Sequence, residues 1–278
     1  MNGKVIVITG ATSGLGRIAA GRLADMGARL VLVARSKARA EATLAHLSTR
    51  GPGLPHRAFY ADLSRIAEVK RVGAEIAAAE PRIDVLINNA GSIFGARRLT
   101  EEGLERTFAT NHMAYFVLTQ ALLGRLKASA PARVVNTASG AHVGHHLDFA
   151  DLQMAKGYWL LTAYGRSKLA NILFTRELAG RLAGTDITAN CLHPGFVSTN
   201  LGQRDNGLLG LAQRFAMLFA DAPEKGAETI VYLASSPDVE GVSGGYFRDC
   251  RLARASREAQ DDDSARRLWE VSARLAGN

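Results

Sequence analysis

The sequence predicts an α/β protein with one doubly wound parallel sheet and helices on both of its faces. Three observations support this fold class. Short runs of β-branched and apolar residues alternate with helical patterns along the chain. A glycine-rich segment joins the first such run to the first helix. The 278 residues contain no repeat or low-complexity linker and suffice for one large core, so we expect a single domain over 1–278.

Seven segments are expected to form the sheet. Each is a short, largely apolar run of the kind that a parallel sheet buries on both faces. The expected strands are 4–9, 29–34, 57–61, 83–87, 132–138, 187–192 and 245–247.

Helices are expected between these runs, because apolar residues recur there at spacings of three and four. Gly27 closes the first helix, and Asp62, directly or through Ser64, is a candidate N-cap for the third. The later expected helices are 38–47, 66–79, 101–127, the helix that carries Tyr164, 224–235, and a polar amphipathic helix from 261 to about 275.

Composition excludes several classes of protein. The net charge is +8, but the basic residues are scattered without interleaved aromatic residues, so we expect no nucleic-acid partner. No apolar run approaches the ~18 residues of a membrane span, and the first residues lead directly into a strand rather than a signal peptide. We therefore expect a cytoplasmic protein. Cys191 and Cys250 match neither a disulfide framework nor a metal site.

The segment Thr9-Gly-Ala-Thr-Ser-Gly-Leu-Gly16 lies between a strand and a helix. Bare glycine backbone lets a pyrophosphate approach, and a helix N-terminus supplies amide donors and a positive dipole. The segment therefore predicts a dinucleotide site of the Rossmann type, with a purely structural turn as the alternative. The residues expected to contact the cofactor here are Gly10, Thr12, Ser13, Gly14, Leu15 and Gly16.

Arg35 follows the second strand, where an acidic residue would bind a ribose hydroxyl in NAD-dependent proteins. A guanidinium instead grips a phosphate with two donors, so we favour NADP(H) over NAD(H). Lys37 or Arg39 would assist, although Arg35 could simply begin a solvated helix. Asp62 and Leu63 follow the third strand, where the adenine is expected to lie.

Further candidates occur at the ends of later strands, where ligands bind in open parallel sheets. Asn89, Ala90 and Gly91 are expected to approach the nicotinamide ribose, unless they form only a tight turn. Pro194-Gly195 forces a turn, after which Val197 and Thr199 would address the carboxamide. The apolar stretch around 200–222 is interpreted as a substrate lid.

Tyr164 and Lys168 are four residues apart on a predicted helix, so they share one face. An ammonium near a phenol is expected to lower the phenol pKa from about 10, which suits proton transfer. The alternative is an ordinary surface pair. Asn111 lies within an apolar helical stretch, where a poor helix former suggests a specific polar role or a satisfied structural side chain. Ser139 places a hydroxyl at the end of the fifth strand.

These motifs, in this order, resemble the classical short-chain dehydrogenases/reductases, and the resemblance covers essentially the whole chain. Within that family the sequence is most similar to the retinol dehydrogenase-like branch, through stretches such as Ala163-Tyr-Gly-Arg-Ser-Lys-Leu-Ala-Asn-Ile-Leu-Phe174 and Arg267-Leu-Trp-Glu-Val-Ser272.

The resemblance implies four catalytic roles. Tyr164 would be the general acid or base, and Lys168 would lower its pKa and bind the nicotinamide ribose. Ser139 would hold the substrate oxygen, and Asn111 would order a proton-relay water. The resemblance also implies a homodimer or homotetramer built through the long helices that carry Asn111 and Tyr164.

The segment between Ser139 and Tyr164 is long for the family and contains His142, His145, His146 and Asp148. We interpret it as a loop at the substrate mouth and expect no metal site. The expected function is NADP(H)-dependent interconversion of an alcohol and its ketone or aldehyde on an apolar small molecule. The alternatives are a C=C reductase resembling protochlorophyllide reductase and a non-catalytic regulator that binds a nicotinamide nucleotide.

Overall fold

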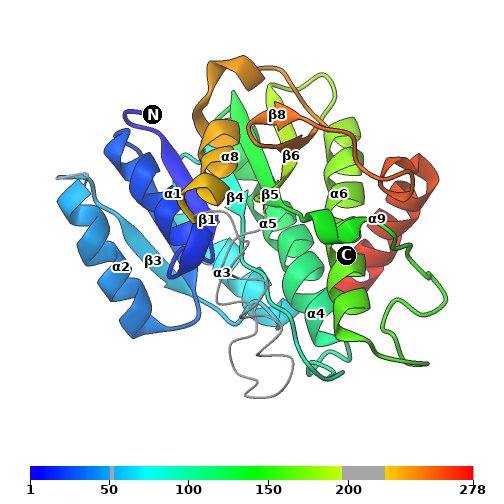
Figure 1. Ribbon diagram of the computed structural model, residues 1–278. Coiled ribbons are helices and arrows are strands. Elements are labelled where there is room, and N and C mark those ends of the chain that lie inside the picture. Colours follow the sequence, from blue (N-terminus) through cyan, green and yellow to red (C-terminus); the bar gives the residue numbers. More distant parts are fainter. Residues whose placement is uncertain (51–52, 196–222, 278) are drawn as a thin grey trace.

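Eight strands form one sheet at the centre of the molecule, in the order β3-β2-β1-β4-β5-β6-β7-β8 (Figure 1). The computed structural model describes residues 1–50, 53–195 and 223–277. Strands β1 to β7 are parallel, and β8 runs antiparallel to β7. The strands are β1 (Val5–Thr9), β2 (Arg29–Ala34), β3 (Arg57–Tyr60), β4 (Val85–Asn88), β5 (Ala132–Thr137), β6 (Ile187–His193), β7 (Tyr246–Arg248) and β8 (Arg251–Leu252).

Helices cover both faces of the sheet. One face packs against α1 (Gly14–Asp25), α2 (Lys37–Arg50) and α8 (Pro223–Ser235). The other packs against α3 (Ile66–Ala79), α5 (Ala114–Ala128) and α6 (Leu160–Arg181). This arrangement confirms the predicted single-domain, doubly wound α/β fold.

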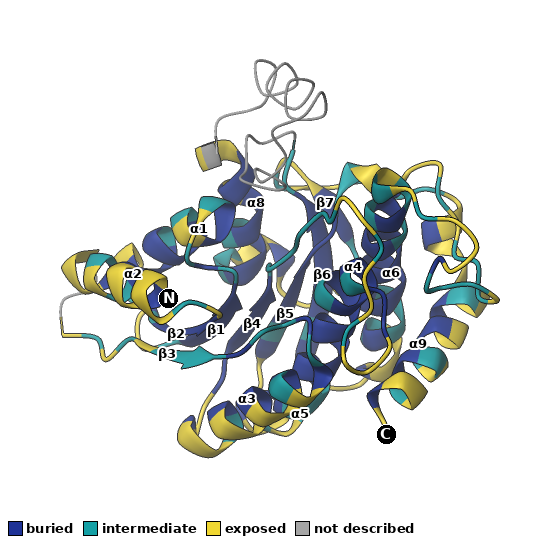
Figure 2. Cartoon of the chain, turned by 90° about the horizontal axis from the view of Figure 1, so that it is seen from below, coloured by how far each residue is buried: buried dark blue, intermediate teal, exposed yellow. Residues whose placement is uncertain are grey.

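The sheet is buried on both sides, as the apolar runs predicted. All residues of β1 and β4 are buried, and Figure 2 shows the strands between helices that are exposed only on their outer surfaces. Burying an Ile or Leu side chain stabilises the fold by about 1.5–3 kcal/mol relative to exposure. Successive side chains of β1 point to opposite faces of the sheet, so Val5 and Val7 pack in one core and Ile6 and Ile8 pack in the other.

The strand order reverses at β1, which pairs with β2 on one side and β4 on the other. In open α/β sheets, ligands bind at such a switch point, outside the carboxyl ends of the strands. The ends of β1, β2, β4, β5 and β6 therefore define the edge at which the predicted site must lie.

The prediction of a helix over 101–127 is wrong for its first residues. Helical structure begins only at α4 (Arg106–Phe108), continues through a π-helical turn, η1 (Ala109–Met113), and then becomes α5. Residues before Arg106 form a turn closed by a bridge between Leu99 and Glu105. The Glu105 carboxylate accepts the backbone N–H groups of Thr107 and Phe108 and so caps the helix start.

The C-terminal helix α9 (Asp262–Ala276) lies against α6, as the amphipathic pattern of the tail allows. Its Trp269 ring packs on Phe116 of α5 and Phe174 of α6, with centroid distances of 5.0 and 5.8 Å. Arg181 lies over the same indole at 4.4 Å. Helix α9 therefore covers the groove between α5 and α6.

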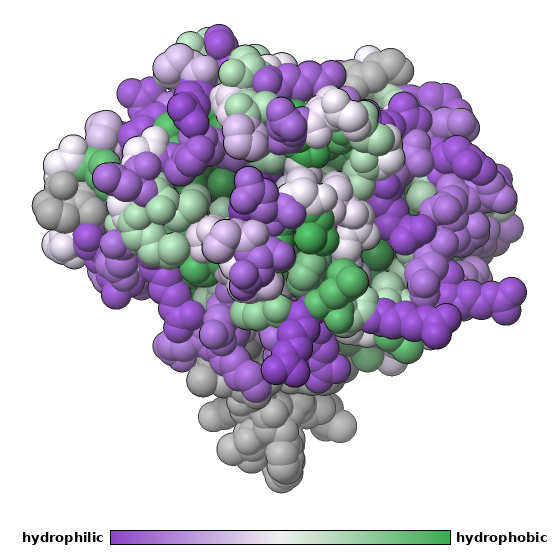
Figure 3. Space-filling model, turned by 90° about the horizontal axis from the view of Figure 1, so that it is seen from above, coloured by the Kyte–Doolittle hydropathy of each residue, from purple (hydrophilic) through white to green (hydrophobic). Residues whose placement is uncertain are grey.

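The outer surface is largely polar on the face shown in Figure 3, where hydrophobic residues appear as small separate areas. Among the helices that the structure describes, none combines the length and apolarity needed to cross a membrane.

Candidate active site

Tyr164 and Lys168 lie one turn apart in the first half of α6, as predicted. The Lys168 side chain is only 2% exposed, and its Nζ lies 5.6 Å from the centre of the Tyr164 ring. Lys168 Nζ donates to the main-chain oxygen of Thr137 at 2.9 Å, which ties α6 to the end of β5. The pair is therefore built into the carboxyl edge of the sheet and is not a surface pair.

Burial dominates the acid–base properties of both side chains. It raises the pKa of Tyr164 to about 12, opposed by a hydrogen bond with Ser139. Tyr164 as a whole residue is half-buried. Burial lowers the pKa of Lys168 to about 7. The predicted lowering of the tyrosine pKa is therefore wrong for the groups of this chain, because spacing indicates proximity but not desolvation.

Ser139 lies directly beyond β5, and its side chain interacts with Tyr164 and lowers the pKa of that tyrosine against the effect of burial. Its Oγ also accepts the N–H of Ala141 at 3.1 Å and caps the short 3-10 helix Gly140–His142. His142 is buried, with Nδ1 2.7 Å from the Ser139 carbonyl oxygen, and Nε2 accepts the N–H of Ser256. This histidine of the long loop thus supports the serine.

Asn111 lies in the π-helical turn η1 and is completely buried. Its Oδ1 accepts the N–H of Ser92 at 2.8 Å, and its Nδ2 donates to the Ser92 carbonyl oxygen at 2.9 Å. Nδ2 also lies 2.9 Å from Ser167 Oγ on α6. Asn111 therefore joins the chain after β4 to the helix that carries Tyr164. Single π-helical turns within helices are frequent at functional sites.

The glycine-rich turn has the conformation that its residue types predict. Gly10 and Gly14 have φ values of +71° and +51°, which side chains rarely adopt. Ser13 occupies the N-cap position of α1, and in the described structure its side chain makes no capping hydrogen bond. The first N–H groups of α1 are therefore available to an anion.

Asn89 packs between Gly10 and Gly16, an arrangement that the motifs alone do not reveal. Its Nδ2 donates to the carbonyl oxygen of Thr9 at 3.1 Å. Thr9 Oγ1 in turn accepts the N–H groups of Asn89 and Ala90 at 2.9 and 3.0 Å. Thr9 is a site-building residue that the sequence interpretation missed, although it directly precedes Gly10.

Replacing Gly16 by Ala is expected to destabilise the protein by about 1–3 kcal/mol. A Cβ at this position would lie 2.4 Å from Asn89 Nδ2 and 2.4 Å from the main-chain oxygen of Gly10. The turn would have to shift, which would also weaken cofactor binding. Urea unfolding and a nucleotide titration check this, with Gly124→Ala as control, because nothing lies within 4 Å of a Cβ at Gly124. Equal stability of the two variants would contradict the close packing.

Gly91 brings the catalytic candidates together. A Cβ there would lie 3.3 Å from Lys168 Nζ and 3.5 Å from Asn111 Oδ1, so both side chains approach the bare backbone after β4. Ala90 and Gly91 thus lie beside the lysine, as the prediction of a ribose-facing turn requires.

Arg35 and Lys37 are exposed at the end of β2 and the start of α2. Lys37 Nζ is 3.9 Å from Glu41, a weak surface pair. Burial raises the pKa of Asp62, but hydrogen bonds from Ser64 and the charge of Arg35 outweigh it, so the pKa is lowered overall. Arg35 and Asp62 therefore act on each other electrostatically at the predicted adenosine side.

Asp62 does not cap α3, in contrast to the prediction. Arg65 occupies the N-cap position, and Asp62 Oδ1 instead accepts the N–H and the hydroxyl of Ser64 at 2.9 and 2.8 Å. Leu63 packs against the core with its side chain partly buried. Its predicted contact with a cofactor would have to come from its backbone.

Pro194 and Gly195 directly follow β6, and Gly195 has a φ of +84°. They therefore lie at the carboxyl edge, as predicted, but the residues that would complete the predicted turn lie outside the described part of the chain. Val197, Thr199 and the predicted lid at 200–222 lie outside the described residues.

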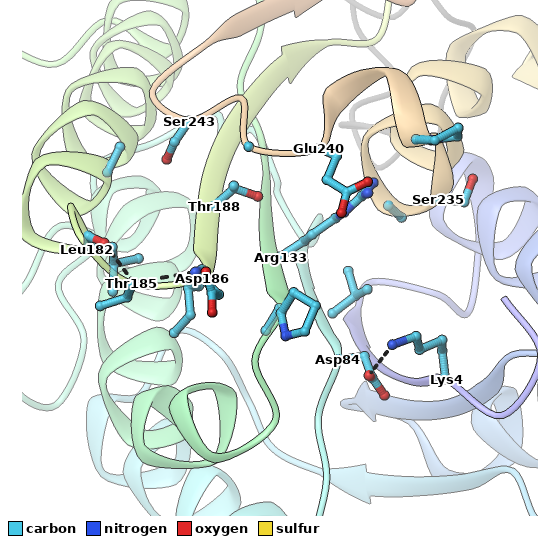
Figure 4. A pocket seen from close by; sticks show the side chains of 18 of the residues that line it. Lys4, Asp84, Arg133, Leu182, Thr185, Asp186, Thr188, Ser235, Glu240 and Ser243 are labelled. Carbon is cyan, nitrogen blue, oxygen red and sulfur yellow. Dashed lines mark hydrogen bonds and ion pairs between the residues drawn. The ribbon is translucent and has the colours of Figure 1, made fainter.

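A cavity of about 580 Å³ opens at the opposite edge of the sheet (Figure 4). Its lining includes Lys4, Asp84, Arg133 and Asp186, which stand at the amino ends of strands. The Arg133 guanidinium faces the Glu240 carboxylate there, and Lys4 pairs with Asp84 at 2.9 Å. The cavity includes no residue of the Tyr164 site, so volume alone does not locate the chemistry.

Comparison with known proteins identifies the family of the chain. The family model described as short chain dehydrogenase matches residues 4–207. The chain therefore belongs to the short-chain dehydrogenase/reductase family.

Its relatives include retinol dehydrogenase 14 of Mus musculus, 43% identical over 100% of this chain and 87% of that protein. Retinol dehydrogenase 13 of Homo sapiens is 41% identical over 99% and 85%. These relatives confirm the resemblance to the retinol dehydrogenase-like branch.

Solved structures share the fold. An uncharacterized protein from Mycobacterium paratuberculosis superimposes with a TM-score of 0.79 and 31% identity, covering 100% of this chain and 94% of that one. A short chain dehydrogenase from Burkholderia cenocepacia, in complex with NADP, gives a TM-score of 0.71 and 27% identity over 88% and 96%. The protein is thus an oxidoreductase by family, related to enzymes of alcohol and carbonyl chemistry.

Proposed function

We propose that the protein is an NADP(H)-dependent oxidoreductase that interconverts an apolar alcohol and its ketone or aldehyde. The observation that carries this proposal is the meeting of Tyr164, Ser139 and Lys168 at the carboxyl edge of the sheet. The Ser139 and Tyr164 side chains interact with each other, and the lysine lies one turn along the helix that carries Tyr164. This is the donor set that a carbonyl oxygen gaining negative charge requires.

The residues present fit a nicotinamide dinucleotide. The uncapped start of α1, the positive φ of Gly10 and Gly14, and the bare backbone at Gly91 would admit its pyrophosphate and ribose. Arg35 and Lys37 are exposed cations at the end of β2, where a 2′-phosphate would bind. Such a cofactor would supply the hydride.

The chain's own residues would then handle the proton. Tyr164, with its pKa raised by burial, stays protonated at neutral pH and can donate to a carbonyl oxygen. Ser139 offers a second hydroxyl toward the same oxygen, which stabilises the negative charge that develops there. Lys168 holds the Thr137 carbonyl and lies beside Gly91, where it can bind a ribose and replenish the proton.

An apolar substrate is supported by large exposed side chains near the site. Trp159 and Leu161, at the start of α6, are 61% and 54% exposed, and Val143, just after the Ser139 turn, is 64% exposed. These residues are close in sequence to the Tyr164 and Ser139 positions that they would flank. Retinol, in the names of the relatives, is an apolar primary alcohol, which agrees with this class.

The proposal is tested by following the absorbance of reduced nicotinamide with a panel of apolar aldehydes and ketones. NADPH-dependent consumption with an alcohol as product is expected. Product analysis after one turnover separates C=O from C=C reduction. Binding of NADPH without turnover of any compound in either direction would instead favour a nucleotide-binding regulator.

Replacing Arg35 by Asp is expected to weaken NADPH binding by about 100-fold, while NADH binding changes little or improves. The guanidinium would contribute about 1.5–3 kcal/mol through charge-assisted hydrogen bonds to the 2′-phosphate, and the new carboxylate would repel it. Competitive titration of NADPH against NADH measures the ratio. Arg274→Asp, an exposed charge reversal on α9, is the control. Unchanged NADPH preference in Arg35→Asp would refute the role of Arg35.

A further inference from the structure

His112 is a fully buried histidine to which the mechanism above gives no role. It lies in η1 directly after Asn111, and its ring packs near Phe108 and Phe174 at 5.0 and 6.1 Å. Its Nε2 lies 2.8 Å from Ser272 Oγ of α9, a residue 160 positions away in sequence. Burial lowers the pKa of His112 to about 3, so the ring is neutral at ordinary pH and has one donor and one acceptor.

Asn171 lies between His112 and the catalytic lysine. Its Nδ2 donates to the Thr137 main-chain oxygen at 3.3 Å, and Lys168 Nζ donates to the same oxygen at 2.9 Å. The Tyr115 hydroxyl donates to this oxygen as well, at the longer distance of 3.5 Å, so Lys168 is the shortest of three donors that share it. The titratable side chains that face Lys168 are Tyr164 of the same helix and Tyr115 of α5, whose ring centres are 5.6 and 5.8 Å from Nζ.

The surroundings of His112 indicate which nitrogen carries the imidazole proton. His112 Nδ1 and Asn171 Oδ1 are both buried, and neither has a hydrogen-bond partner at hydrogen-bond distance within the described chain. The two side chains nevertheless interact, which raises the pKa of His112 against the effect of burial. Because Asn171 uses its amide N–H toward Thr137, its free Oδ1 can only accept. His112 must then donate from Nδ1 and accept the Ser272 hydroxyl at Nε2.

We propose that His112 is a positioning residue for the reaction: with Ser272 it fixes the Asn171 amide, which shares the Thr137 carbonyl with Lys168 and so sets where the lysine ammonium lies. The reaction itself is that of the proposed function, on which this proposal rests. The chain of contacts can be tested without turnover. It also gives α9 a part in the active site, since Ser272 is buried and holds the outer end of the chain of contacts.

The first test is the tautomer of His112 in ¹⁵N-histidine-labelled protein. Imidazole nitrogen shifts distinguish a protonated from a bare ring nitrogen, and the His112 signal is assigned by its absence in His112→Asn. A proton on Nδ1 and a bare Nε2 are expected. A proton on Nε2 would overturn the proposal, because a bare Nδ1 facing Asn171 Oδ1 cannot hold the amide.

The second test follows the titration of Lys168 through its ¹³Cε shift, assigned with Lys168→Met. His112→Leu removes both ring nitrogens, and the titration midpoint is expected to move by more than about half a pH unit. His112→Asn keeps a donor near the Nδ1 position and is expected to restore the midpoint. Leu47→Ala, a buried change in the core on the other face of the sheet, controls for lost stability and is expected to leave the midpoint unchanged.

Activity supplies the third readout. In His112→Leu, kcat is expected to fall by about 10- to 100-fold with a smaller change in KM, and His112→Asn to recover most of it. A His112→Leu variant that is as unstable as Leu47→Ala but keeps kcat and the Lys168 midpoint would refute the positioning role. Absence of NADPH-dependent turnover in the unaltered protein would instead refute the proposed function, whereas the two NMR tests would still decide whether the chain of contacts exists.

Discussion

Replacing Tyr164 by Phe is expected to lower kcat for carbonyl reduction by about 10²- to 10⁴-fold, while the Kd for NADPH changes by less than about twofold. The phenol oxygen is the only part removed, and the ring that packs at the start of α6 stays. Ser139 keeps its hydroxyl but cannot replace the phenol as the proton donor, because an aliphatic hydroxyl is a much weaker acid than a phenol. The loss should therefore fall on kcat and not on nucleotide binding.

Stopped-flow reduction and nucleotide titration measure these two quantities in Tyr164→Phe. Tyr60→Phe is the matched control, because Tyr60 is a half-buried phenol at the end of β3, an outer strand of the sheet. It is expected to retain full activity. A Tyr164→Phe variant that turns over at the original rate would remove Tyr164 from the chemistry, whatever the fold.

Replacing Lys168 by Met is expected to lower kcat by about 10²- to 10³-fold and to weaken NADPH binding. The ammonium donates to the Thr137 oxygen and lies beside Gly91, so its removal affects both the proton path and the predicted ribose contact. Met fills a similar volume without charge, which limits the change in packing. An unaltered kcat would show that the lysine serves only the structure.

The same variant tests how the free energy of unfolding of the nucleotide-free protein depends on pH. Burial lowers the pKa of Lys168 to about 7, whereas a lysine in the unfolded chain titrates near 10.4. Between these values the unfolded chain binds more protons than the folded protein, so this group makes the free energy of unfolding rise with pH.

Below about pH 7 the folded lysine must also be charged, and its burial lowers stability there. Lys168→Met removes this dependence. Between pH 7 and 9.5 the free energy of unfolding of the original protein should therefore rise more than that of the variant, by about 3 kcal/mol. Urea unfolding at several pH values measures this. Parallel curves for the two proteins would mean that Lys168 is not desolvated.

The fold was predictable because its signals are local. Runs such as Val5 to Ile8 are buried on both faces, and a strand of this kind is recognisable from composition alone. The residue at which the α4–α5 region begins was not predictable, because the bridge between Leu99 and Glu105 and the cap supplied by Glu105 are tertiary arrangements. The short antiparallel β8 likewise has only two exposed residues and carries no apolar pattern.

The candidate site was predictable in its residues but not in its electrostatics. Spacing placed Lys168 one turn from Tyr164, yet the direction of the tyrosine pKa depends on desolvation, which no spacing encodes. The partners of Asn111 could not be predicted either, since Ser92 and Ser167 belong to other segments. The cofactor roles assigned from motifs, including that of Arg35, stay predictions.

The position of α9 constrains how copies of this protein can meet. The resemblance implied subunits joined through the helices that carry Asn111 and Tyr164, but Trp269 already fills the groove between α5 and α6. A second copy approaching there would meet the outer side of α9, whose exposed residues include Arg266, Glu270 and Arg274. Cores of protein–protein contacts are depleted of charged residues, because burying them requires desolvation. The quaternary structure, if the protein has one, is therefore expected to use another surface.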